Sequence, residues 1–274
     1  MDLTEYRTLS HGTWERMAAG WDGWNQMLAQ SSRPVTDDMV AALDPKAGET
    51  ILELAAGAGV TGFAAASVMQ GAGQLIMTDF ASHMVEACER RGSELGFTNI
   101  DYRLMDAERI DLADDSVDGV LCRWGYMLMA EPSVALRETR RVLRDGGRLS
   151  FSVWGAPADN PFPSVPGRIL VELGHMPPPK MGEPGMFALA DPNRVEQLVR
   201  GAGFEALQLR QVRMSWAFND FESLWTCLNE VTPLAFVIAK LGERELAIVR
   251  SEIKRALDPL GYDLPGICMN GLAR

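Results

Sequence analysis

Short apolar segments alternate with helix-forming segments between residues 50 and 154, and this alternation limits the fold more than any other feature of the sequence. Five segments have the length and apolar character of buried strands, namely 50–55, 75–78, 100–105, 117–122 and 148–154. Helix-forming segments separate several of them, at 63–69, 81–95 and 133–143. Since neighbouring parallel strands need crossover connections, the sequence predicts an α/β fold with a doubly wound, Rossmann-like sheet.

The segments on either side of this region predict four parts of the chain. Residues 1–45 form a helical N-terminal part, in which tryptophans and Met17 recur at three- and four-residue steps and Pro34 and Pro45 are expected to break the helix. That stripe either packs on the main core or acts as a lid. The binding core then spans residues 46–155.

Residues 156–190 contain eight prolines, which argues against one continuous helix or strand and favours an insertion that serves as a lid or substrate loop. Residues 191–274 complete the sheet and add cap helices. We expect two strands, 204–211 and 213–218, to form an antiparallel pair, and helices at 192–202 and 243–257. An apolar helical face from Phe221 to Ile238 is expected to kink or break before Pro233.

The charge balance argues against a nucleic-acid partner. The 274 residues include 26 basic and 37 acidic side chains, a formal net charge of −11, and no block of lysine or arginine. No basic and apolar leader opens the chain and no apolar stretch approaches the roughly 20 residues of a membrane span, so we expect a cytoplasmic protein without a membrane span.

The cysteines and histidines do not have the spacing of metal ligands. Four cysteines, at positions 88, 122, 227 and 268, are too far apart to form a Cys-x-x-Cys pair, and no two of the three histidines are spaced as a ligand pair. We therefore expect no metal site, and we expect the cysteines to be buried small residues of a reducing compartment.

A glycine-rich turn, Gly57-Ala58-Gly59-Val60-Thr61-Gly62, follows the first predicted strand and precedes a helix. Glycine allows a ligand to approach the backbone closely, and the start of a helix presents free N–H groups. Asp79 lies twenty residues beyond Gly59, at the end of the next strand, where a carboxylate can accept hydrogen bonds from ribose hydroxyls. The turn and the acid together predict an adenosine-type cofactor.

Two classes of cofactor compete for this turn. A dinucleotide would place its pyrophosphate at the start of the helix, but Glu53, inside the first strand, would repel that group. S-adenosylmethionine has no phosphate, and Glu53 could help to organise its methionyl end. Asp106, at the end of the third strand, could accept from an adenine amino group while Ala107 N–H donates to a ring nitrogen. The alternatives are that Glu53 only holds the glycine turn and that Asp106 only caps its strand.

Four segments in this order resemble the motifs of the class I S-adenosylmethionine-dependent methyltransferases. They are ILELAAGAG (51–59), MTDFASHMVEAC (77–88), MDAERIDLADDSVDGVLCRWG (105–125) and LRETRRVLRDGGRLSFSVW (136–154). The resemblance covers roughly residues 50–154. It implies the sheet of that family, S-adenosylmethionine as the cofactor, and cofactor contacts from the positions that match the motifs: Glu53, Ala55, Gly57, Gly59, Asp79, Phe80, Met84, Asp106 and Ala107.

One position departs from the family pattern. Residue 55 is alanine where these enzymes usually have glycine, and its methyl group would crowd a turn that needs a positive φ. We therefore expect a slightly reshaped turn at this position.

The N-terminal pattern Trp14-x-x-Met17-Ala18-x-x-Trp21-Asp22 resembles the aromatic-rich opening of the ubiquinone/menaquinone C-methyltransferase group. In that group an aromatic residue near this position closes over the cofactor. The resemblance implies that Trp21 is a lid residue that contacts the cofactor.

The acceptor is expected at the carboxyl ends of the fourth and fifth strands. Arg123, at the end of the fourth strand, is assigned to the cofactor site; it could instead pair with an acidic acceptor or bond only to loop carbonyls. Trp124 and Tyr126 follow it and could form the wall of an aromatic or prenyl-like substrate site, or simply pack in the core. Apolar side chains of the proline-rich insertion would complete the lining: Phe162, Met181, Met186 and Phe187.

The sequence does not identify a general base. His11, near the expected lid, and His175, in the insertion, are weak candidates, whereas His83 is expected on the cofactor side or in a structural role.

The sequence therefore predicts a methyltransferase that moves a methyl group from S-adenosylmethionine to a small, apolar or aromatic acceptor by in-line displacement. A homodimer is compatible with the sequence, which leaves the oligomeric state open. The acceptor atom stays open among oxygen, nitrogen, carbon and sulfur. A catalytically silent S-adenosylmethionine-binding interaction protein and an NAD-dependent oxidoreductase are the alternatives.

Overall fold

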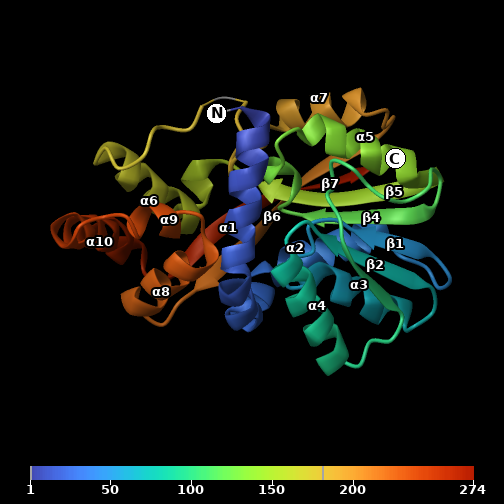
Figure 1. Ribbon diagram of the computed structural model, residues 1–274, viewed down its shortest axis with the longest axis horizontal. Helices are drawn as coiled ribbons and strands as arrows, with labels where there is room; N and C mark the ends of the chain where they lie inside the picture. The colour runs from blue at the N-terminus through green and yellow to red at the C-terminus, as the bar shows by residue number, and fades with distance from the viewer. Residues whose placement is uncertain (1, 181) are drawn as a thin grey trace.

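The computed structural model describes residues 2–180 and 182–274, so Met181, one of the expected lining residues, lies outside the described part of the chain. Seven strands form one sheet in the order β3-β2-β1-β4-β5-β7-β6 (Figure 1). Their bounds are β1 Thr50–Glu53, β2 Gln74–Asp79, β3 Ile100–Leu104, β4 Val117–Arg123, β5 Leu143–Trp154, β6 Leu207–Ala217 and β7 Asp263–Ala273.

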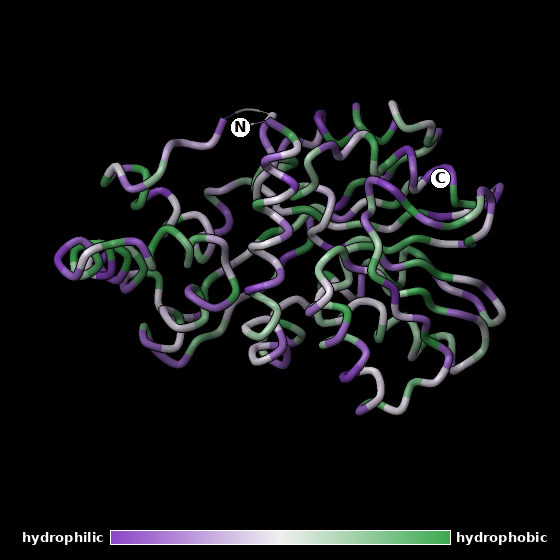
Figure 2. The backbone as a smooth tube through the Cα atoms, viewed as in Figure 1, coloured by the Kyte–Doolittle hydropathy of each residue, from purple (hydrophilic) through white to green (hydrophobic). Residues whose placement is uncertain are grey.

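Strands β1 to β5 are parallel, as the alternation of segments predicts. The crossover helices are α3 (Val60–Met69), α4 (Ser82–Glu94) and α5 (Pro132–Val142). Central strands are buried on both faces, and the tube through them is mostly green in Figure 2. Strand β1 pairs with β2 on one side and β4 on the other, so the chain order reverses at β1. A ligand site is expected beyond the carboxyl ends of the strands at this reversal.

The antiparallel end of the sheet is present, but its strands differ from the expected ones. One strand, β6, runs through residues 207–217 of both expected segments, and it pairs along its whole length with β7. The expectation that these two segments pair with each other is therefore wrong. No turn residues separate them, and the true partner, β7, comes some fifty residues later. The chain also enters β5 earlier than expected, with a register shift around its two glycines.

Two helices make up the N-terminal part, α1 (Leu3–Gly23) and α2 (Asn25–Leu43). The helical expectation is confirmed, but the expected break at Pro34 is wrong, because Pro34 lies inside α2. A proline leaves the carbonyl four residues earlier without its partner. That carbonyl belongs to Gln30, an exposed residue, so water can replace the lost hydrogen bond.

The cap is built from helices that follow β5. Helix α6 (Pro161–Glu172) occupies the first half of the proline-rich insertion, while 173–190 has no long regular element among its described residues. Helices α7 (Pro192–Gly201), α8 (Phe221–Val231), α9 (Ala235–Ile238) and α10 (Glu243–Leu257) follow. The predicted interruption before Pro233 is confirmed, since it separates α8 from α9. Helix α1 runs between the sheet and this cap in Figure 1.

The close contact between β5 and β7 generates a stability prediction. Gly271 lies opposite Phe151 across the two strands, and a Cβ on Gly271 would come within 2.3 Å of the Phe151 ring. Gly271→Ala should lower the free energy of unfolding by about 1–3 kcal/mol, because the buried ring cannot move away without disturbing the core. Chemical denaturation measures the change.

Gly167→Ala is the matched control. Gly167 lies within α6, and its added methyl group would meet only Leu234, at 4.0 Å. This variant should be as stable as the wild type or gain up to about 1 kcal/mol from helix propensity. A loss of stability in Gly167→Ala equal to that in Gly271→Ala would contradict the packing argument.

Candidate functional site

Asp79 joins the two turns that follow β1 and β2. It is the last residue of β2 and is buried; one carboxylate oxygen accepts from Gly57 N–H and the other from Ala81 N–H, each at 3.0 Å. Burial raises the pKa of Asp79 to about 6, although these backbone donors act in the opposite direction. The predicted acid therefore lies against the predicted glycine turn.

The glycines of the turn allow it to pack closely. Gly57 and Gly59 both have a positive φ, and a Cβ at Gly59 would lie 2.4 Å from the Phe63 ring. A Cβ at Gly62 would lie 2.3 Å from Glu53 Oε2. The turn thus needs glycine for its conformation at the first two positions and for its contact with a carboxylate at the third.

Ala55 adopts the positive φ that the sequence suggested, with φ 51°. A left-handed conformation costs an alanine about 1–2 kcal/mol. Gly125 makes room for the methyl group, since a Cβ on Gly125 would come within 2.8 Å of Ala55 Cβ. The methyl group of Ala55 is accommodated because the facing residue, Gly125, has no side chain.

Glu53 and Arg123 end the neighbouring strands β1 and β4, and both are buried. Arg123 Nε donates to Thr61 Oγ1 at 2.9 Å, and its guanidinium lies 4.3 Å from the centre of the Trp124 ring. Glu53 Oε2 and Arg123 Nη1 have no hydrogen-bond partner in the described structure. Buried polar atoms without partners are rare, so this pair is a candidate for contacts with a ligand that carries groups of both charges.

Burial changes the ionisation of both side chains. It raises the pKa of Glu53 to about 8, against the influence of the Arg123 charge and of a hydrogen bond from the Gly62 backbone. Burial also lowers the pKa of Arg123 to about 10. Perturbed ionisable groups at the carboxyl edge of an α/β sheet are typical of functional sites.

Asp106 lies at the same edge but is exposed, and its Oδ1 accepts from Glu108 N–H at 2.8 Å. This contact is the strand-end cap that the sequence left as an alternative. Met105 N–H donates to Asp79 O at 2.9 Å, so the chain entering the Asp106-Ala107 segment lies beside Asp79. Ala107 is buried.

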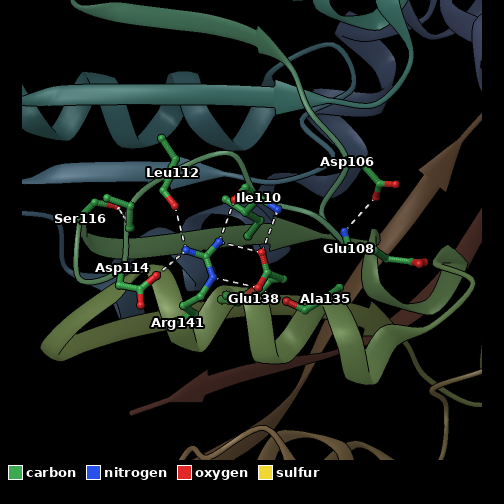
Figure 3. Close-up of polar contacts among 11 residues, drawn as sticks. Asp106, Glu108, Ile110, Leu112, Asp114, Ser116, Ala135, Glu138 and Arg141 are labelled. Atoms are coloured by element: carbon green, nitrogen blue, oxygen red, sulfur yellow. Dashed lines mark hydrogen bonds and ion pairs between the residues drawn. The ribbon is translucent and has the colours of Figure 1, made fainter.

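The loop after Asp106 is held by an ion-pair network on α5 (Figure 3). Arg141 donates to the carbonyls of Ile110 and Leu112 at 2.7 and 2.8 Å and pairs with Glu138. Glu138 in turn accepts from Ile110 N–H at 3.1 Å. This network fixes the segment that follows the third predicted acid, and no sequence motif indicated it.

Trp21, on α1, lies over the glycine turn. Its ring is 3.7 Å from the position of a Cβ on Gly57, and its Nε1 donates to Val231 O at the end of α8 at 3.1 Å. Met84 and Phe80 pack in the same small apolar cluster as Trp21. The structure therefore brings together three of the residues expected around the cofactor.

An aromatic cluster fills the space beyond the ends of β4 and β5. Trp124, which has φ 62°, stacks on Trp154 with ring centroids 4.6 Å apart, and Trp216 lies 6.1 Å from Trp124. The Phe162 ring is 5.1 Å from Trp216. Two expected lining residues, Trp124 and Phe162, thus share one cluster. Trp154 and Trp216 also belong to it, and the only feature of the sequence that could have indicated them is their position near strand ends.

Tyr126 and Phe187 lie elsewhere. Tyr126 is buried, and its hydroxyl lies 2.7 Å from Thr139 Oγ1 on α5. Core packing therefore accounts for Tyr126, and its position does not support the expected substrate contact. Phe187 is half-buried in the loop before α7, a loop whose Gly185 N–H donates to Met127 O. Met186 is also half-buried in that loop.

The histidines do not meet at the predicted site. His11 Nε2 lies 3.5 Å from Glu15 Oε1, and the His11 ring meets Phe80 edge-on. His175 follows the end of α6, whereas Phe162 is at its start, so about 15 Å of helix separate His175 from the aromatic cluster. These positions do not support either residue as a general base.

A groove of about 700 Å³ lies on the cap side of α1. It is formed by α1, α8, α9 and the first turn of α10, and its lining is mostly apolar: Arg16, Met17, Ala19, Gly20, Trp225, Asn229, Glu230, Ala235, Phe236, Ile238, Ala239, Leu241 and Leu246. Gly20 lines the groove, and Trp21 is the next residue of α1. Trp21 is not among the lining residues; its ring lies over the glycine turn.

Two findings concern residues 2–180 and 182–274 only. No helix among them is long and apolar enough to cross a membrane. No three of their histidine, cysteine or acidic side chains gather as a metal site would require. The four cysteines are buried and free.

Comparison with known proteins gives the same picture of the fold. A family model described as a methyltransferase domain matches residues 53–151. The chain is 29% identical over 163 residues to the ubiquinone/menaquinone biosynthesis C-methyltransferase of Caulobacter vibrioides, a match that covers 56% of this chain and 64% of that protein. The chain thus matches less than two thirds of this relative's length.

Solved structures with the same fold are more distant in sequence. The YcgJ protein from Bacillus subtilis aligns with a TM-score of 0.58 at 18% identity, over 87% of this chain and 97% of that one. The cyclase SpnF aligns with a TM-score of 0.57 at 16% identity, over 95% of each chain. These likenesses identify the fold, and the second one shows that proteins of this fold are not all named for methyl transfer.

The raised pKa of Glu53 predicts how stability depends on pH. Because its pKa in the folded state, about 8, lies above the ordinary value of 4.5, ionisation opposes folding as the pH rises between these values. Glu53→Gln cannot ionise. Relative to this variant, the wild type should lose about 2–3 kcal/mol of unfolding free energy between pH 6 and pH 8.5.

Urea denaturation of both proteins at the two pH values measures the effect. The pKa of Asp79 is raised only to about 6, so its contribution falls mostly below this window and is common to both proteins. Parallel pH profiles of the wild type and Glu53→Gln would show that burial does not raise the Glu53 pKa.

Proposed function

We propose that this chain, which belongs to the class I S-adenosylmethionine-dependent methyltransferase family, transfers a methyl group from S-adenosylmethionine to a small, apolar or aromatic acceptor by in-line displacement. The observation that carries this proposal is the group of buried, perturbed polar side chains at the carboxyl edge of the sheet. Asp79 bridges the turns after β1 and β2, and Glu53 and Arg123 each present an unpartnered polar atom beside them.

The charges at this edge favour S-adenosylmethionine over a dinucleotide. A pyrophosphate at the start of α3 would lie close to Glu53, whose Oε2 is within 2.3 Å of the position of a Cβ on Gly62. The methionyl group of S-adenosylmethionine instead carries an ammonium and a carboxylate. We assign the ammonium to Glu53 and the carboxylate to Arg123, which satisfies both unpartnered atoms.

The remaining contacts follow the order of the strands. Asp79 accepts from the ribose hydroxyls, and the Asp106-Ala107 segment meets the adenine. Phe80, just after β2, and Met84, on α4, cover the nucleoside, and Trp21 covers the glycine turn from α1. The bound cofactor supplies a methyl group already activated on a sulfonium, so the chain's own contribution is to orient the acceptor and exclude water.

The cap supplies room for an acceptor. The groove beside α1 has a volume of about 700 Å³, which is the size of a small-molecule site, and its lining is mostly apolar. Trp124 and Phe162, two of the expected lining residues, are buried in the aromatic cluster and do not line this groove. We therefore assign an acceptor that is small and largely apolar or aromatic.

Binding and transfer are tested separately. Calorimetry should detect S-adenosylmethionine and S-adenosylhomocysteine but not NAD⁺. Transfer of a labelled methyl group to members of a small-molecule library then tests turnover. Binding without transfer to any acceptor would favour a catalytically silent interaction protein, and binding of NAD⁺ alone would favour an oxidoreductase and overturn the proposal.

The ribose assignment predicts a specific loss of affinity. Asp79→Ala should weaken the binding of S-adenosylhomocysteine by about 1–3 kcal/mol, because it removes a charged hydrogen-bond acceptor. Asp118→Asn is the control, since Asp118 lies at the opposite end of the sheet, where it accepts from Thr50 N–H and pairs with Arg144. Equal affinity of the wild type and Asp79→Ala, measured by calorimetry, would refute the assignment.

Trp21 should contribute to retention of the cofactor more than to folding. Trp21→Ala is expected to increase the dissociation rate of S-adenosylhomocysteine at least about fivefold, since it uncovers the glycine turn. Trp24→Ala is the control, at the residue that follows the same helix: Trp24 Nε1 donates to Glu230 Oε2 at 2.5 Å, on the side of the cap helices. Stopped-flow release kinetics measure both, and a Trp21→Ala protein that melts earlier but releases the ligand at the wild-type rate would show a purely structural role.

A further inference from the structure

Helix α4 begins beside the proposed ribose acid without a cap of its own. Its N-cap residue is Ala81, whose side chain cannot accept a hydrogen bond, and its first turn contains no acidic residue. The first N–H groups of a helix need acceptors from elsewhere. Ala81 is only two residues from Asp79, so the acceptor that caps α4 also fixes the residues that follow Asp79.

Glu15, from the middle of α1, supplies the missing acceptor. Its Oε1 accepts from Ser82 N–H at 2.7 Å and from Ser82 Oγ at 3.0 Å, and its Oε2 accepts from His83 N–H at 3.1 Å. The two residues that meet here are 67 positions apart in the sequence. A carboxylate at the start of a helix is also favoured by the helix dipole.

The surroundings keep this carboxylate ionised. Burial acts to raise the pKa of Glu15, but the hydrogen bonds from His83 N–H and from Ser82, together with the nearby His83 ring, lower it overall. His83 Nδ1 lies 2.9 Å from Glu15 Oε2, and His11 Nε2 lies 3.5 Å from Glu15 Oε1. Two of the three histidines therefore surround this one carboxylate instead of facing an acceptor.

The same segment is held from its other side by Asp79, which accepts from Ala81 N–H. Residues 79–83 are thus fixed between an acid of the sheet and an acid of α1. Trp21 lies six residues after Glu15 on the same helix, about 9 Å further along its axis. Any movement that lifts Trp21 from Gly57 as part of a rigid α1 therefore also removes the cap from α4.

We propose that Glu15 is a positioning residue that links closure of α1 over the glycine turn to the conformation of the ribose-binding segment. The inference rests on the proposed cofactor site, because it concerns how that site is positioned. It assigns Glu15 no contact with the cofactor. With α1 in place, Glu15 fixes the start of α4 and thereby the orientation of Asp79 and Phe80. Cofactor binding and lid closure then favour one another.

Three variants test this link. Glu15→Ala removes the acceptor, Glu15→Gln keeps one oxygen that can accept from Ser82 N–H, and Arg90→Gln breaks a different contact between the same two helices, the 2.5 Å ion pair of Arg90 with Asp22. Calorimetry with S-adenosylhomocysteine measures affinity. Amide hydrogen exchange of Ser82 and His83 in the cofactor-free protein measures the cap directly.

We expect Glu15→Ala to raise the dissociation constant about tenfold, the effect of losing a helix cap, and to speed exchange of both amides by a similar factor. Glu15→Gln should restore slow exchange at Ser82 but not at His83, because its amide nitrogen cannot accept from the second N–H, and it should restore the affinity in part. Arg90→Gln should leave the affinity and both exchange rates within about twofold of the wild type. Equal effects of Glu15→Ala and Arg90→Gln on affinity would reduce Glu15 to an ordinary helix contact and overturn the proposal, as would unchanged exchange in Glu15→Ala.

The two measurements separate this proposal from the proposed function. If the wild type binds neither S-adenosylmethionine nor S-adenosylhomocysteine, the proposed function fails, and with it the link to the cofactor. The exchange data are independent of any ligand and still decide whether Glu15 holds residues 79–83. If the wild type binds the cofactor but Glu15→Ala binds it equally well, only the positioning role fails.

Discussion

The arrangement of the site depends on one carboxylate that bonds to two backbones. Asp79 accepts from Gly57 N–H on one side and Ala81 N–H on the other, so the turn after β1 and the start of α4 have a fixed relation at the point where the strand order reverses. Parallel strands end at one edge but leave their following loops free to diverge. A short acid at the end of β2 removes that freedom for the two neighbouring loops that follow β1 and β2.

Helix α1 adds a second layer of restraint from outside the sheet. Its first turns pair with the loop after β3 through Arg7 and Glu108, its middle caps α4 through Glu15, and its end reaches the cap helices through Trp21 and Val231. A rigid helix with three such anchors moves as one body. The segments expected to surround an adenosine, a ribose and an acceptor are therefore coupled to the same element.

The limits of sequence reasoning follow from where the determinants of each element lie. Strands β1 to β5 could be predicted because each is a local apolar run followed by its own crossover. Strand β7 could not, since it contains Pro265, Gly266, Gly271 and a buried Asn270, none of which favours a strand. Its partners supply the reason for it: Gly271 is required by the Phe151 ring opposite, and Asn270 Nδ2 donates to Val35 O on α2. Because β7 was missed, the residues of β6 were paired with each other instead.

The same distinction applies within the site. Glu53, Asp79 and the glycine turn were predictable, because the ends of parallel strands meet whatever else the chain does. Glu15 was not predictable, since no residue near position 15 indicates a contact with Ser82. The sequence did contain half of that information: Ala81 cannot cap the helix it precedes, and a helix that starts at a binding loop must take its acceptor from whichever element covers the loop. An uncapped helix beside a predicted site therefore indicates that an acid belongs to the covering element, and in this chain Glu15 is the acid of α1 that faces it.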